Sequence, residues 1–200
     1  MGGAYVALSP DIQRGVFGVG GMPYSLLLPR SYDFDPFFRI FDEKYDDHRE
    51  KMLIIAGLLE QLWDVADPTA WAWDFKNPQQ GLPDKQVLMQ VAIGDAQVTT
   101  LGAHVQARTY GASLIKPETR TVWGLNVAEP PFTGSALVEW RYTDIADEPF
   151  ESIPPDEETD PHECPRRDPA GQQQVTLFLE TGTVDHFCDG PCESIQATCR

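Results

Sequence analysis

The amino-acid sequence predicts an α/β fold with a mostly parallel sheet. Strand-like runs alternate along the chain with segments of helical period, which is the pattern of such folds. Residues 87–93 form a largely apolar seven-residue run, typical of a strand buried on both faces of a parallel sheet. At 200 residues the chain is long enough for one domain with a sizeable core.

The N-terminal half predicts a helix, a strand and a helical insertion. Residues 3–8 indicate a small-residue helix that ends at the turn 9–11, and residues 14–20 indicate a buried strand bounded by glycines. Asp35 and Pro36 can start the next helix. Residues 50–63 predict a well-buried helix, with apolar side chains on one broad face: Leu53, Ile54, Leu58 and Leu62.

The C-terminal half repeats the alternation of strand and helix. After the 87–93 run, a helix is expected from about Val98 to Tyr110, with Gly111 as its C-cap. Residues 135–142 predict a second strand. A final helix should start at Asp168-Pro169 and stop at Gly182.

The charge distribution excludes two classes of partner. The net charge is −16 and the pI is about 4.4, so nucleic acids and anionic membranes would be repelled. No run of 18 apolar residues is present, and the N-terminus lacks the features of a signal peptide. Nine acidic residues and no basic ones lie between Arg141 and Arg166, which favours a solvated loop over a calcium site because no EF-hand spacing occurs.

The four cysteines lie within the last 37 residues: Cys164, Cys188, Cys192 and Cys199. A clustered, even set favours disulfides and an oxidising compartment. Free thiols and a zinc site with His162 or His186 remain alternatives, although the spacing lacks the close C-x2-C pairs of structural zinc sites.

Asp95 follows the 87–93 strand directly after Gly94, where the carboxyl ends of parallel strands gather catalytic groups. It could instead cap the helix expected near Val98. Aromatic side chains between residues 30 and 80 indicate either core packing or the lining of a ligand pocket: Phe37, Trp71 and Trp73.

These features together resemble the C-terminal half of an α/β-hydrolase. In that family the triad follows the order Ser, then Asp or Glu, then His. The segment 94–98, GDAQV, resembles the family's acid-bearing turn, and Asp160-Pro161-His162 precedes the final helix, where the family places its histidine. The resemblance covers residues 1 to about 182 and is greatest to bacterial secreted or lipid-anchored esterase and lipase-like proteins. It implies Asp95 as the acid and His162 as the base, with His186 as the alternative base.

The family's nucleophile motif, G-x-S-x-G, does not occur in the sequence. We therefore expect Met1 to be an internal methionine of a longer protein, just downstream of that motif, and this chain to have little hydrolase activity alone. The alternative is a non-enzymatic exported module stabilised by disulfides.

The resemblance also implies a domain organisation and a substrate class. Residues 1–182 would be the C-terminal portion of a hydrolase domain with a cap at about 30–80, and residues 183–200 a Cys-rich tail. The substrate would be a small-molecule ester or lipid-like compound in contact with Phe37, Trp71 and Trp73, with no metal or other cofactor. The parent protein would be extracellular, periplasmic or lipid-anchored, whereas its oligomeric state is left open.

Overall fold

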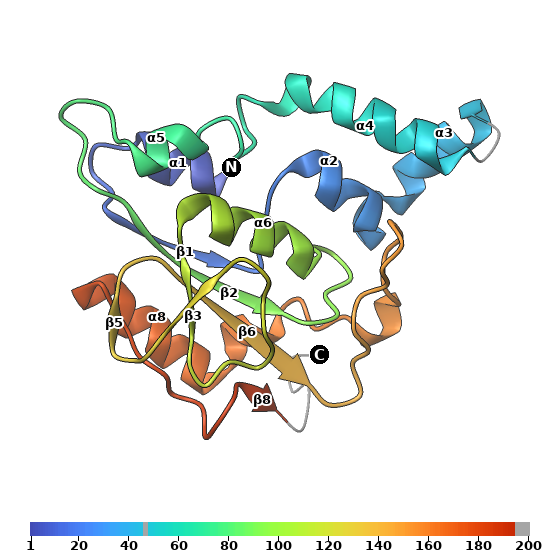
Figure 1. Cartoon of the computed structure of the whole chain (residues 1–200). Helices are drawn as coiled ribbons and strands as arrows, with labels where there is room; N and C mark the ends of the chain where they lie inside the picture. The colour runs from blue at the N-terminus through green and yellow to red at the C-terminus, as the bar shows by residue number, and fades with distance from the viewer. Residues whose placement is uncertain (46–47, 195–200) are drawn as a thin grey trace.

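The computed structural model describes residues 1–45 and 48–194 and shows an α/β fold built on a parallel sheet (Figure 1). Five strands lie in the order β1-β2-β6-β3-β4, and β8 pairs with β6 beyond them. All pairings within this sheet are parallel. Its strands are β1 (Arg14–Gly18), β2 (Gln86–Ala92), β3 (Ser113–Ile115), β4 (Asn126–Ala128), β6 (Ala136–Tyr142) and β8 (Glu193–Ser194).

Helices cover both faces of the sheet (Figure 1). One face carries α1 (Gly2–Leu8), α5 (Ala72–Lys76) and α6 (Thr100–Tyr110), and the other carries α8 (Pro169–Thr181). Further short elements are α7 (Cys164–Arg167) and a two-stranded antiparallel sheet of β5 (Phe132–Thr133) and β7 (Thr183–Val184).

A helical segment connects β1 to β2 and extends away from the sheet (Figure 1). It contains α2 (Tyr24–Leu27), α3 (Asp35–Tyr45), α4 (Arg49–Trp63) and α5, together with the 3-10 turns Leu28–Arg30 and Tyr32–Phe34. These elements occupy the position expected for the insertion at residues 30–80.

The central strand β2 is buried on both faces, as its apolar run predicts. Val87 and Met89 point into the core beneath α1 and α6, where they meet Ala103 and Ala107. Leu88 on the opposite face packs with Phe178 of α8, which is fully buried. Because successive side chains of a strand alternate between faces, one strand supplies both cores.

The ends of two helices follow the glycines that the sequence indicates. Gly111 closes α6 with φ of 71°, and Gly182 closes α8 with φ of 78°, both in the left-handed region. Asp168 caps α8 by accepting a hydrogen bond from Ala170 N. These boundaries were predicted from local chemistry and are confirmed.

The expectation that α4 is well buried is wrong. Ile54, Leu58 and Leu62 are 64%, 62% and 72% exposed, whereas Met52 and Ala56 form the buried side of the helix. The helix extends beyond the edge of the main body, so only a narrow side of it meets α2 and α3. Periodicity alone does not say how wide a face the rest of the protein covers.

Among the described residues, no helix has the combination of length and apolar character that crossing a bilayer requires.

Candidate acid-base site

Asp95 and His162 come from loops at the carboxyl ends of the adjacent strands β2 and β6. Ile93 and Gly94 separate β2 from Asp95, and Gly94 adopts a φ of 85°. A Cβ at Gly94 would lie 2.3 Å from Ala146 O, so glycine is required for the close approach of the loop that follows β6. Parallel strands end at the same edge of the sheet, which places the two loops side by side.

The structure brings these two residues, 67 positions apart, into direct contact. His162 Nδ1 lies 2.9 Å from Asp95 Oδ2 and 3.1 Å from Oδ1. Asp95 is 1% exposed and His162 is 9% exposed. Since a carboxylate accepts hydrogen bonds, Nδ1 carries the proton and Nε2 is left with its lone pair.

Burial and charge act in opposite directions on this pair. Burial raises the pKa of the Asp95 carboxyl, and the hydrogen bonds from His162 and from the amides of Val98 and Gln97 oppose that rise. Burial lowers the pKa of His162, but the hydrogen bond and negative charge of Asp95 outweigh it, so the pKa of His162 is raised above its ordinary value. The imidazole is therefore more basic than a free histidine.

Asp95 is not the N-cap of α6. Its Oδ1 accepts from Gln97 N and Val98 N at 2.8 Å each, which forms a local turn before the helix. The N-cap is Thr99, whose side chain accepts from Leu101 N. The helix begins within two residues of the expected start, but the alternative that Asp95 caps it is wrong, because Asp95 lies too far ahead of the first turn.

Asp160 joins the two loops that carry the pair, a role that the sequence did not single out. Its Oδ1 accepts from Ala96 N and His162 N at 3.1 Å each, and its Oδ2 accepts from Gln97 Nε2 at 2.8 Å. One carboxylate therefore fixes both loops at the residues next to the contact. The sequence feature that could have indicated this role is an aspartate two residues before the histidine. At that spacing an aspartate carboxylate commonly accepts a hydrogen bond from the backbone amide two residues further on.

Arg166 is the group that the described structure places against the outer nitrogen of His162. Its Nη2 lies 3.4 Å from His162 Nε2 and donates to Gly18 O at 3.2 Å. The guanidinium also pairs with Glu163. It lies beside the end of β1, so three strand ends converge around Nε2.

Two cavities border the end of β1. One of about 350 Å³ is lined by Gly18, Gly20 and Val98, and it lies on the side of α1. The other, of about 540 Å³, is lined by Gly18, Arg166 and Val175 on the side of α8. The edge of β1 away from β2 has no strand paired with it in the described part of the chain.

A second histidine–carboxylate pair, in which the carboxylate is buried and the histidine half-buried, lies away from the strand ends. His104 Nε2 is 2.7 Å from Glu139 Oε1, and Arg120 donates to both oxygens of Glu139 at 3.0 and 2.9 Å. Arg120 also donates to Thr100 Oγ1, which in turn donates to Glu148. This network ties α6, the loop after β3, and β6 together.

The three aromatic residues expected to bind substrate are not brought together. Phe37 is 56% exposed on α3 and stacks with Phe34, whereas Trp73 is 75% exposed on α5 at the other end of the helical layer. Trp71 packs partly buried against the core beside α5. None of them lines either cavity at the end of β1.

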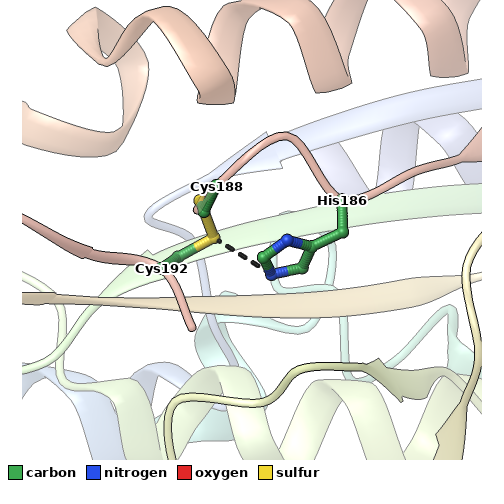
Figure 2. A group of neighbouring side chains, drawn as sticks. All are labelled: His186, Cys188 and Cys192. Carbon is green, nitrogen blue, oxygen red and sulfur yellow. Dashed lines mark hydrogen bonds between the residues drawn. A yellow bond between two sulfur atoms is a disulfide. The ribbon is translucent and has the colours of Figure 1, made fainter. Parts of the chain in front are cut away.

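The cysteines of the described region are disulfide-bonded. Cys188 and Cys192 form one disulfide, and His186 Nε2 lies 3.5 Å from Cys192 Sγ (Figure 2). Cys164 is also disulfide-bonded and lies two residues after His162. The expectation for Cys199 lies outside the described residues. His186 stands next to the disulfide, so the structure pairs Asp95 with His162 and not with the alternative histidine.

No protein-family model, curated protein or solved structure matches this chain.

Proposed function

We propose that Asp95 and His162 are the acid and base of a serine-hydrolase site of the α/β-hydrolase type, which cleaves carboxylic esters. The observation that carries this proposal is the bond from His162 Nδ1 to Asp95 across the ends of two adjacent parallel strands. That bond leaves Nε2, which now faces Arg166, as the nitrogen that can accept a proton, which is the arrangement a hydroxyl nucleophile needs.

The proposed mechanism assigns one task to each residue. His162 Nε2 accepts the proton of the nucleophilic hydroxyl and later returns it to the leaving alcohol. Asp95 holds the tautomer and stabilises the imidazolium that forms between these steps. Asp160 positions both loops, since it bonds to the amides on either side of the contact.

The nucleophile is proposed to come from polypeptide outside the printed sequence. The serine of a strand-turn-helix elbow must reach Nε2, and the free edge of β1 lies beside that nitrogen. The cavities on both faces of Gly18 leave that edge of the sheet accessible. Arg166 would have to withdraw from Nε2 to admit the hydroxyl.

The test is to express the chain continuously with the segment encoded in frame upstream of its Met1 codon and to measure hydrolysis of short and long acyl esters. We expect a G-x-S-x-G elbow in that segment and ester hydrolysis by the joined protein. Asp95→Asn should reduce kcat by about 10⁴-fold, because an aspartate that fixes the histidine tautomer contributes that much. His104→Gln is the matched control and should leave kcat unchanged.

An upstream stop codon with no elbow, or a joined protein whose hydrolysis does not depend on His162, would contradict the proposal. The substrate class, the α/β-hydrolase relationship and an extracellular, periplasmic or lipid-anchored location all belong to this proposal.

The alternative is a non-enzymatic exported binding module. The two disulfide-bonded sites and the exposed apolar side chains of α4 favour it. It predicts that a chain without any nucleophile is the functional form, so an upstream stop codon would support it.

A further inference from the structure

The segment that follows β7 brings three metal-ligating side chains together. His186, Cys188 and Cys192 present one imidazole nitrogen and two sulfurs within 4.8 Å of one another (Figure 2). The sulfurs are joined in a disulfide, and the imidazole points its Nε2 at the nearer one. The proposed hydrolase uses none of these groups.

We infer that reduction of the Cys188–Cys192 disulfide converts this cluster into a binding site for a zinc-like divalent ion. Zn²⁺ binds thiolate at about 2.3 Å and imidazole at about 2.0–2.1 Å in tetrahedral geometry, so its sulfur and nitrogen ligands stand roughly 3.5 Å apart. The Cys192 Sγ to His186 Nε2 distance is 3.5 Å. The imidazole is therefore already at the ligand position before any ion enters.

The two sulfurs must separate to complete the site. They stand about 3.8 Å apart in a tetrahedral zinc site, whereas in the disulfide they are bonded to each other. The Cα atoms are 5.3 Å apart, so side-chain rotation can supply much of that separation. The cluster offers three protein ligands, which leaves the fourth position to water.

The conversion is balanced by a dithiol reductant. The reductant gives two electrons and two protons to the disulfide, forms its own disulfide, and leaves two protein thiols. The divalent ion then displaces those two protons as the thiolates bind, while neutral His186 donates its Nε2 lone pair. Cys188 is half-buried and open to attack, whereas Cys192 is 1% exposed.

The inferred ion would hold together the same segment, residues 186–192, that the disulfide now holds together. Arg141 N donates to Cys192 O, and β8 begins at the next residue and pairs with the end of β6. Cys192 also packs in the core on the α8 side of the sheet. A metal bridge would therefore keep the loop 186–192, which leads directly into β8, closed under reducing conditions.

The test is a Co²⁺ titration of the reduced full-length chain carrying Cys164→Ser and Cys199→Ser, which removes the other thiols. We expect one equivalent of tetrahedral Co²⁺ with sulfur-to-metal charge-transfer absorption, displaced by Zn²⁺. His186→Ala should weaken Co²⁺ binding at least tenfold, and Cys188→Ser should abolish the charge-transfer band. His48→Ala, which changes an exposed histidine outside the cluster, is the matched control.

If the double serine variant does not fold, the titration is made on the reduced wild-type chain against Cys188→Ser/Cys192→Ser. Equal Co²⁺ spectra in those two proteins, or the same affinity with and without His186, would overturn the inference. Failure of ester hydrolysis in the joined protein would leave this result unchanged, because the readout is metal binding.

Discussion

The two histidine–carboxylate pairs both contain a buried carboxylate but differ in what surrounds it. Asp95 and Glu139 are 1% and 2% exposed, and each binds an imidazole at 2.9 Å or less. Glu139 lies within β6 and is shared by His104 and Arg120. Asp95 lies beyond the end of β2, and its histidine partner has a second nitrogen that faces the converging strand ends.

This difference in surroundings distinguishes the His104–Glu139 pair, which links structural elements, from the His162–Asp95 pair, which is the candidate site. His104 Nε2 contacts Glu139, and the guanidinium of Arg120 pairs with the same carboxylate within the fold, beside a cavity of about 270 Å³. His162 Nδ1 contacts Asp95, and its Nε2 faces Arg166, which is itself held by Glu163 and Gly18 O. A buried pair whose second imidazole nitrogen lies at the carboxyl edge of a parallel sheet is suited to chemistry.

The largest expected effect is on the free energy of unfolding, which should fall by different amounts when the carboxylate of each pair is replaced. Glu139→Gln should lower the free energy of unfolding by about 2–3 kcal/mol, because the half-buried guanidinium of Arg120 then keeps only its longer ion pair with Glu148. Asp95→Asn should cost about 1–2 kcal/mol, since the amide oxygen can still accept from Gln97 N and Val98 N. Urea unfolding followed by tryptophan fluorescence measures both, and equal losses would remove the distinction.

A smaller effect is expected from Asp160, which serves only the site pair. Asp160→Ala should lower the free energy of unfolding by about 1–2 kcal/mol, because buried amides of both loops lose their acceptor. Asp156→Ala is the matched control, since Asp156 makes a similar turn bond to Glu158 N in an exposed position. If the two variants were equally stable, Asp160 would not join the loops in solution.

The smallest effect is the opposite dependence of the two pairs on pH. The folded-state pKa of His162 is raised, so its stabilisation is complete below about 6.5 and is lost as the pH rises through the folded value. Burial raises the pKa of Glu139, but the hydrogen bonds and charges of His104 and Arg120 lower it by a larger amount. The net pKa is therefore below the ordinary value of 4.5.

The stabilisation by Glu139 is therefore complete above pH 4.5 and is lost as the pH falls through its folded pKa. Between pH 4 and 9, the difference in unfolding free energy between the wild type and His162→Gln should shrink toward the alkaline end, and the difference between the wild type and Glu139→Gln should shrink toward the acid end. Shrinkage of both differences at the same end would contradict these assignments.

Local patterns predicted the elements that frame the site. The apolar run 87–93 and the glycines at 111 and 182 have direct local causes, so β2, α6 and α8 were found with their ends nearly correct. The contact between Asp95 and His162 was expected from their order along the chain in a resembling family. That contact is present, whereas its catalytic role stays a proposal.

Features that depend on long-range packing were not predicted. Strands of two or three residues, such as β4 and β5, carry too little pattern to identify. The exposed side of α4 and the separation of Phe37 from Trp73 follow from where the helical insertion lies, which periodicity does not encode. The role of Arg120 with Glu139 also needs the fold, since 19 positions separate them.

The most direct test of the central claim is the tautomer and pKa of His162 by ¹⁵N and ¹H NMR of the imidazole. We expect a proton on Nδ1 that is hydrogen-bonded to Asp95, no proton on Nε2 in the neutral ring, and a pKa above the ordinary value of about 6.5 that Asp95→Asn lowers. A proton on Nε2 in the neutral ring, or a pKa that Asp95→Asn does not change, would contradict it.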